Sequence, residues 1–175
     1  GAIAINMRDA PDMTLEHVGV RGGDFGVLVH DDSSGFTTDE TLFSRNTHDG
    51  LGVYNNSPGI WIDNVTAWEN GRHGIYVESV LDHVRDTVVY DNGESGMALR
   101  AVGAAVIERS QAYCTGLSVL CQRTGIDIIN PGPDGAVVGH SDLTALLGNK
   151  VHHNDFEGIF ASGNVLVAGN AGWNN

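Results

Sequence analysis

The sequence predicts an all-β solenoid, a single right-handed parallel β-helix that spans residues 1–175. A short phrase, glycine followed by an apolar, a variable and a second apolar residue, recurs at steps of 22 to 33 residues. Val, Ile, Thr, Gly and Asn are abundant, whereas apolar runs with the helical period of about 3.6 residues are absent. About seven coils are expected, most of 22 to 24 residues and two of them longer and irregular.

The recurring phrase predicts the first strand of each coil. Its apolar positions have a period of two, which is typical of a strand with one buried face. The phrase begins at Gly26, Gly50, Gly74, Gly96, Gly125 and Gly158. Ile3 and Ile5 are expected to form the equivalent strand at the start of the chain. Each glycine is expected to adopt a backbone conformation that other residues resist.

Two further apolar columns predict a second and a third strand in each coil. The second column contains Met13, Phe36, Ile60, Val84, Val106 and Val137. The third column contains Val20, Phe43, Ala67, Val89, Ala112, Val151 and Ala171. Equivalent strands are expected to stack about 4.8 Å apart, so that each coil buries its inward side chains against its neighbours.

A polar column three residues after the third strand predicts a tight corner. It contains Gly23, Asn46, Asn70, Asn92, Thr115, Asn154 and Asn174. Stacked asparagines satisfy turn backbone groups and hydrogen-bond to one another, so an asparagine ladder is expected.

The two longer coils carry extra residues around Cys114–Cys121, at 131–135 and at 140–146. Insertions in a solenoid fall on loops, either beside a binding face or as tolerated surface segments. The two cysteines are expected either to form a local disulfide or to remain as buried free thiols.

Composition limits the partners. A formal net charge of −13 argues against nucleic acid or an anionic membrane surface as the main partner. No apolar run approaches the ~20 residues that span a membrane, so no membrane insertion is expected. The acidic excess fits a secreted or cell-surface protein, or one that works with divalent cations. Asp31 and Asp32 are candidate Ca²⁺ ligands, although an Asx-rich turn needs no ion.

Outward positions near the first strand carry the candidate catalytic and substrate-binding residues. They are His30, Tyr54, Glu78 and Arg100 in one column, Tyr76 and Asp127 beside it, and Arg72 and His73 at the corner. Epimerising or eliminating a uronate requires a neutralised carboxylate, a base for the acidic C–H and an acid on the other side. Arg72 or Arg100 is expected to serve the first role, and His30 or a tyrosine the others. The alternative is that these outward positions are simply polar and solvated.

A second outward column is aromatic. It contains Arg21, Ser44, Trp68, Tyr90, Tyr113, His152 and Gly172. Trp68 and Tyr90 are candidates for a substrate-binding sugar platform. The alternative is a structural ladder that stabilises the sheet by cross-strand contact.

Three stretches between residue 24 and about residue 100 resemble motifs of a known family. They are Phe25-Gly-Val-Leu-Val-His-Asp31, Val65-Thr-Ala-Trp-Glu-Asn70 and Gly71-Arg-His-Gly-Ile75. They resemble the β-helical catalytic module of the secreted bacterial mannuronan epimerases, which convert mannuronate to guluronate in alginate. The resemblance implies that His30 is the catalytic histidine and that Arg72 and His73 form the family's Arg-His pair.

Other motif positions of that family carry different residues in this chain. Phe25 stands where the family has its catalytic tyrosine, and Leu28 and Tyr54 stand where it has aspartates. Tyr54 or Tyr76 is therefore expected to supply the phenol.

Two functions follow as hypotheses. The first is an extracellular module that binds and modifies an acidic polysaccharide along the face from His30 to Arg100, as an epimerase or a lyase. The second is a non-catalytic structural module of an adhesin, surface fibre or filament. The chain begins and ends within a repeat, so it is expected to be a segment of a longer protein, and the second hypothesis predicts end-to-end self-association.

Overall fold

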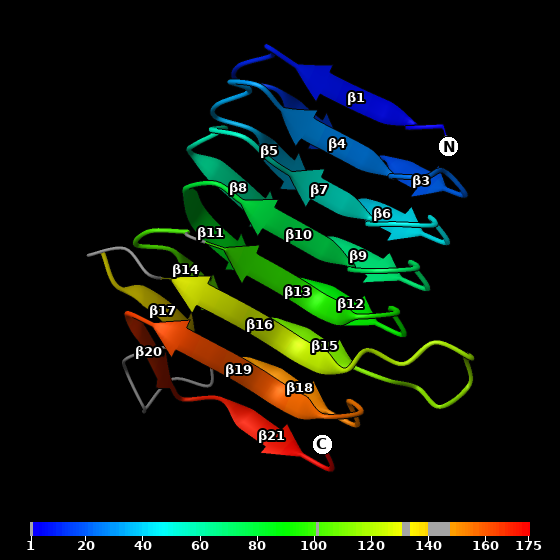
Figure 1. Cartoon of the computed structure of the whole chain (residues 1–175), viewed down its shortest axis with the longest axis vertical. Helices are drawn as coiled ribbons and strands as arrows, with labels where there is room; N and C mark the ends of the chain where they lie inside the picture. The colour runs from blue at the N-terminus through cyan, green and yellow to red at the C-terminus, as the bar shows by residue number, and fades with distance from the viewer. Residues whose placement is uncertain (1, 101, 131–133, 140–147) are drawn as a thin grey trace.

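The computed structural model describes residues 2–100, 102–130, 134–139 and 148–175. In these residues the regular elements are 21 strands, arranged in three seven-stranded sheets with parallel pairing throughout. Each coil contributes one strand to every sheet, and each strand pairs with its equivalent in the next coil (Figure 1). The predicted parallel β-helix is therefore confirmed. No helix long and apolar enough to cross a membrane occurs in the part of the chain described.

We call the three sheets A, B and C. Sheet A contains β1 (Ile5–Arg8), β4 (Val27–His30), β7 (Leu51–Val53), β10 (Ile75–Glu78), β13 (Ser95–Arg100), β16 (Thr124–Asn130) and β19 (Glu157–Gly163). Sheet B contains β2 (Thr14–Glu16), β5 (Thr37–Asp39), β8 (Ile60–Asp63), β11 (Leu81–Arg85), β14 (Val106–Glu108), β17 (Ala136–Gly139) and β20 (Val165–Ala168). Sheet C contains β3 (Gly19–Arg21), β6 (Thr41–Ser44), β9 (Val65–Trp68), β12 (Val88–Tyr90), β15 (Gln111–Tyr113), β18 (Lys150–His152) and β21 (Ala171–Trp173).

Sheet A lies where the glycine phrase predicts it, with one correction at the start. The apolar positions of β4, β7, β10 and β13 are fully buried. At the first coil, however, Ile5 rather than Ile3 pairs with Val27, and Met7 takes the second core position. The prediction was two residues early because a period of two also admits that offset.

Sheet B shows the largest departure from the predicted columns. Val106 pairs with the outward His83, and Val137 pairs with Val106, because a register shift in β11 moves the core positions of the following strands on by one residue. Met13 is also 41% exposed, rather than buried as predicted. Ala171 on β21 in sheet C is likewise exposed, because it is Gly172 that pairs with Val151.

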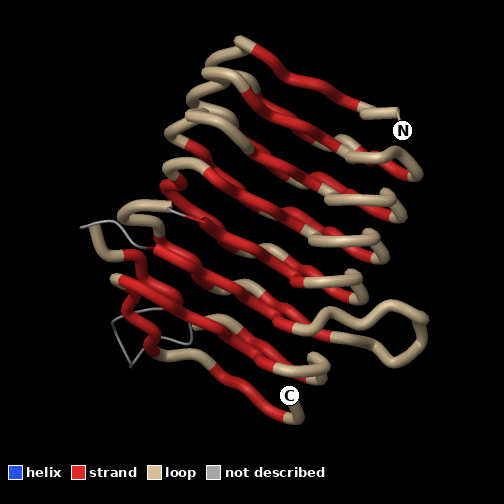
Figure 2. Tube along the Cα trace, in the orientation of Figure 1, coloured by secondary structure: helices blue, strands red, loops and turns tan. Residues whose placement is uncertain are grey.

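The corner between sheets C and A contains the predicted asparagine ladder. Side-chain amides bond coil to coil over 2.8 to 3.2 Å through Asn46, Asn70, Asn92, Gln122, Asn154 and Asn175. Two predicted members, Thr115 and Asn174, are wrong. The loop closed by the Cys114–Cys121 disulfide is inserted before the corner, so the amide of that coil comes from Gln122. Figure 2 shows this loop projecting from the solenoid between β15 and β16.

The glycines of the recurring phrase are needed because a side chain would not fit at their positions, and not because of a special backbone angle. Their φ angles are not positive, contrary to the expectation. A Cβ on Gly74 would lie 2.8 Å from the carbonyl oxygen of Gly96 in the next coil and 2.9 Å from the amide of Asn92. Glycine therefore lets neighbouring coils approach closely beside the ladder. The predicted insertions at 131–135 and 140–146 lie largely outside the described residues.

Candidate functional site

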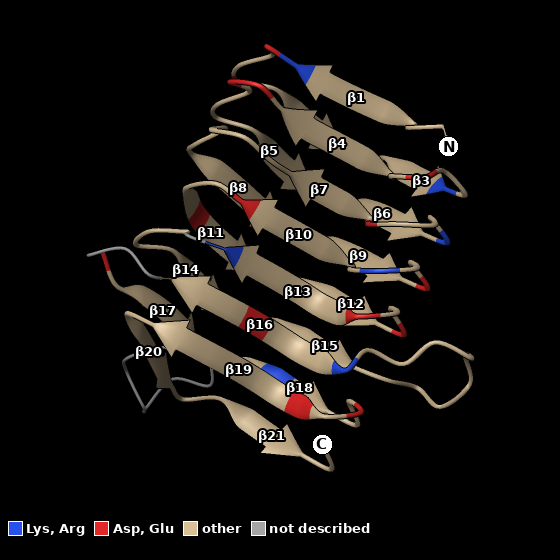
Figure 3. Cartoon of the chain, in the orientation of Figure 1, with Lys and Arg blue, Asp and Glu red and all other residues tan. Residues whose placement is uncertain are grey.

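A hollow of about 510 Å³ lies on the outer face of sheet A, over β10, β13, β16 and the corners that precede them. We call it the central hollow. It is lined by Arg72, His73, Tyr76, Glu94, Ser95, Arg100, Arg123, Thr124 and Asp127. Three of the nine Lys and Arg residues of this acidic chain therefore line one hollow. Acidic and basic segments alternate down β10, β13 and β16 in this region (Figure 3).

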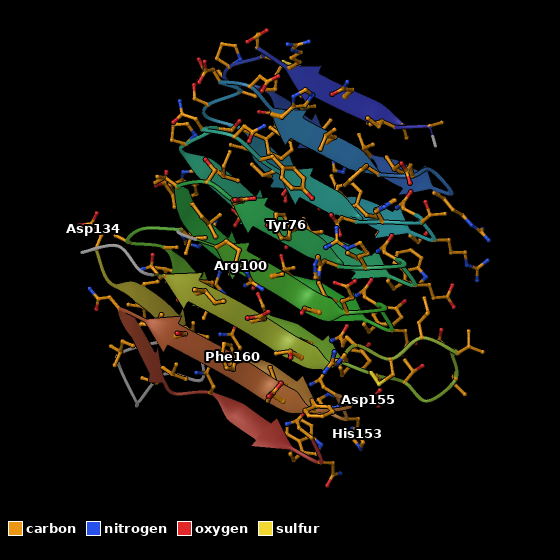
Figure 4. All side chains as sticks on the ribbon, in the orientation of Figure 1. Tyr76, Arg100, Asp134, His153, Asp155 and Phe160 are labelled. Carbon is orange, nitrogen blue, oxygen red and sulfur yellow. A yellow bond between two sulfur atoms is a disulfide. The ribbon has the colours of Figure 1, made fainter. Side chains whose placement is uncertain are left out.

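The strand register brings several of the predicted residues together. Glu78 pairs with Arg100, and Tyr76 lies in register with Asp127 two strands away. Figure 4 shows Tyr76 and Arg100 on neighbouring strands of the same face. Arg100 donates to a carboxylate oxygen and to the backbone carbonyl of Asp127, so its guanidinium is held against β16. The other carboxylate oxygen of Asp127 is buried and has no hydrogen-bond partner in the described structure.

Two tyrosines and a histidine form an aromatic stack along this face. The ring centroids of Tyr54 and Tyr76 are 4.9 Å apart, and those of Tyr76 and His73 are 5.4 Å apart. The phenol of Tyr76 donates to Glu78 over 3.1 Å. Burial, together with this hydrogen bond, raises the pKa of Tyr76, so the phenol is a proton donor at neutral pH.

Asp49 holds the aromatic stack in place through hydrogen bonds. Its carboxylate is fully buried and accepts from the Tyr54 hydroxyl over 2.9 Å and from the His73 backbone N–H over 3.1 Å. Burial and then the charge of Asp49 raise the pKa of Tyr54 far above its ordinary value, so Tyr54 also remains protonated. Sequence reasoning missed Asp49. The repeat could have indicated Asp49, because it stands directly before the phrase glycine Gly50, in the same position that His73 has before Gly74.

His73 is only 5% exposed, and both of its ring nitrogens are engaged. Nδ1 accepts from the backbone N–H of Ser95 over 3.3 Å, and Nε2 lies 3.4 Å from a carboxylate oxygen of Glu94. Burial lowers the pKa of His73, so the neutral ring carries its proton on Nε2 and directs it at Glu94. Arg72 contacts the other oxygen of Glu94 over 3.4 Å. Glu94, which sequence reasoning also missed, is half-exposed and reachable from the hollow.

His30 does not line the central hollow. It lies on β4, with β7 between it and β10, and its Nε2 is 2.7 Å from the Asn6 amide oxygen. Its Nδ1 contacts Asp31, which also binds Arg8 over 3.1 Å. In the part of the chain described, no three or more His, Cys, Asp or Glu side chains are grouped to hold a metal ion. Within those described residues, Asp31 and Asp32 therefore do not belong to such a group, and the Asp31 carboxylate instead binds Arg8 and His30.

Trp68 and Tyr90 lie on the outer face of sheet C rather than beside the central hollow. They begin a ladder of stacked rings with centroid separations of 5.9, 5.3, 4.9 and 4.3 Å, through Trp68, Tyr90, Tyr113, His152 and Trp173. Gly172 was predicted in this column, but His152 pairs with Trp173. Most ring faces in the ladder are covered by neighbouring rings, which favours the structural interpretation for its interior.

The fold and the central hollow together define a parallel solenoid with a charged, aromatic depression on one outer sheet. The chain belongs to the right-handed β-helix family, because residues 1–131 match the family model described as "Right handed beta helix region". No curated protein and no solved structure matches the chain significantly.

Proposed function

We propose that the central hollow binds a uronate unit of an acidic polysaccharide and exchanges the proton on its C5 carbon. The observation that carries this proposal is the gathering of Arg72, Arg100 and Arg123 around an open hollow of a chain with a net charge of −13. Guanidinium groups bind carboxylates through paired hydrogen bonds, and neutralising the sugar carboxylate makes the adjacent C–H more acidic.

Proton transfer is assigned to Glu94 and Tyr76. Glu94 is the exposed carboxylate of the hollow and accepts the C5 proton, while the guanidiniums stabilise the electron pair that moves onto the sugar carboxylate. The protonated phenol of Tyr76 then donates a proton. Donation to C5 from the opposite face inverts the sugar, and donation to the departing glycosidic oxygen completes an elimination. His73 acts as a positioning residue, since its Nε2–H orients Glu94.

The test uses polymannuronate and polygalacturonate, each with and without Ca²⁺. Calorimetry measures binding, deuterium uptake at C5 measures exchange, and ultraviolet absorbance measures unsaturated product. We expect Glu94→Gln to lower exchange about 100-fold or more while binding is retained. We expect Arg100→Gln to weaken binding about tenfold. Arg109→Gln is the matched control, because Arg109 and its partner Asp86 directly follow the sheet B strands β14 and β11 and do not line the hollow.

The opposite results have clear meanings. Exchange that persists in Glu94→Gln contradicts the assignment of the base. If neither polymer binds, the proposal fails, and the second hypothesis, a non-catalytic structural β-helix module, becomes the better explanation.

A further inference from the structure

One end of the aromatic ladder of sheet C lies beside a hollow. In the outward column, Arg21 pairs with Ser44, and Ser44 pairs with Trp68, the first ring of the ladder. Ser44 carries no ring, and a hollow of about 350 Å³ lies over it. We call this the ladder-end hollow; it is lined by Gly19, Val20, Arg21, Leu42, Ser44, Arg45 and Trp68.

Trp68 is the ladder ring whose open face borders this hollow. Tyr90 covers its other face, with a centroid separation of 5.9 Å and an interplanar angle of 8°. Strands in a sheet are about 4.8 Å apart, so a ring placed above Ser44 would lie one strand spacing from Trp68. That spacing falls within the 4.3 to 5.9 Å range of the ladder itself. Leu42, which is 47% exposed, adds an apolar side wall.

The charge of the ladder-end hollow is positive. Arg45 is neutralised by Glu69. Arg21 is exposed, and it forms no ion pair within the described structure. In the strand register, Arg21 lies two strands from Trp68, with Ser44 between them, and its side chain lines the hollow. A ring stacked on Trp68 and carrying a carboxylate would therefore meet a free cation.

We propose that the ladder-end hollow binds one uronate ring of an acidic polysaccharide, with the apolar face of the sugar stacked on Trp68 and its carboxylate bound by Arg21. The choice of acidic polysaccharide rests on the proposed function, whereas the stacking site itself does not. This second site lies on sheet C, and the central hollow lies on sheet A. It is therefore an ancillary binding site that takes no part in proton transfer.

A single-tryptophan reporter tests the site directly. The chain has three tryptophans, so Trp61→Phe and Trp173→Phe together leave Trp68 as the sole one while keeping an aromatic ring at both other positions. The probes are hexagalacturonate and, as the neutral control, cellohexaose. We expect saturable fluorescence change with hexagalacturonate, and about tenfold weaker binding in Arg21→Gln.

Ser44→Tyr is the blocking variant, because its ring extends the ladder into the hollow. We expect it to abolish the Trp68 response, and its thermal midpoint measures whether this position, where Ser44 is only 4% exposed, accepts the ring. Arg21→Gln, an exposed substitution, keeps the test decisive if Ser44→Tyr does not fold. An absent response, or a response unchanged in these variants, would overturn the proposal. Equal binding of cellohexaose would overturn the assignment of an acidic ligand.

The two proposals fail separately. Arg100→Gln should weaken binding in the central hollow and leave the Trp68 response intact. If the polymers show no exchange but the reporter responds, the proposed function is wrong and the ladder-end site stands.

Discussion

Tyr54 and Tyr76 provide a matched test of how the candidate site is held together. Their rings stack on each other, and each hydroxyl donates to one carboxylate. The acceptor of Tyr54 is the fully buried Asp49, whereas the acceptor of Tyr76 is the exposed Glu78. Replacing either tyrosine by phenylalanine removes one oxygen and keeps the ring. Only Tyr54→Phe leaves a buried anionic oxygen without its donor.

The expected cost follows from that difference. A hydrogen bond to a charged group contributes about 1.5–3 kcal/mol, and water cannot replace the donor at a fully buried carboxylate. Tyr54→Phe should therefore lower the free energy of unfolding by about 2 kcal/mol. Water can replace the donor at Glu78, so Tyr76→Phe should cost about 0.5 kcal/mol or less.

Urea unfolding followed by far-ultraviolet circular dichroism measures both values, and equal slopes against urea would show that the midpoints are comparable. Equal costs for the two variants, or a larger cost for Tyr76→Phe, would refute the role assigned to Asp49.

Three further predictions concern the corner beside the site. Gly74→Ala should lower the free energy of unfolding by about 1–3 kcal/mol, because the added Cβ would meet the backbone of the next coil. In the same urea titration, Gly19→Ala should leave this free energy unchanged or raise it slightly, because an added Cβ would have no atom within 4 Å. Asn70→Ala removes four buried hydrogen bonds and should lower the free energy of unfolding by about 4 kcal/mol. Its control, Thr47→Ala, removes one exposed hydrogen bond and should lower that free energy by less than about 1 kcal/mol. Similar losses in the two variants would contradict the role of the ladder in stability. Because burial lowers the pKa of His73, the unfolded chain binds its proton more tightly than the folded chain. The contribution of His73 to the free energy of unfolding should therefore be fully present above about pH 6.5 and should be lost as the pH falls below that value. The free energy of unfolding of His73→Phe should fall less steeply with decreasing pH. An unchanged dependence on pH in this variant would contradict a buried neutral ring.

Most of the fold was predictable because the solenoid repeats its constraints in every coil. The glycine phrase and the asparagine column mark the strand and corner of each coil, and both follow from close contact between coils. The predictions failed where a single coil departs from the repeat. The bulge in β11 shifts sheet B by one residue, and the disulfide loop moves the ladder amide from Thr115 to Gln122. Neither local event leaves a signal in the period of the sequence.

The site was only partly predictable, because a column gives the position of a residue and not its partners. The sequence places Tyr54, Tyr76 and Arg100 on one face, and the structure agrees. It could not show that His30 turns toward Asn6 and Asp31. Nor could it show that both nitrogens of His73 are occupied, since the Ser95 N–H that binds Nδ1 belongs to the next coil.

The positions of the carboxylates near sheet A can be compared with those that the resemblance to mannuronan epimerases implies. The resemblance aligns aspartates of that family with Leu28 on β4 and with Tyr54, which directly follows β7, so this chain has no carboxylate at either position. The corners of neighbouring coils instead place Asp49 against Tyr54 and Glu94 against His73. Of these two, only Glu94 lines the central hollow, because Asp49 is fully buried. In the proposed function, a substrate held by Arg72 and Arg100 therefore meets Glu94 as its base, a residue outside the three stretches that resemble the family, and this difference favours testing several uronate polymers rather than alginate alone.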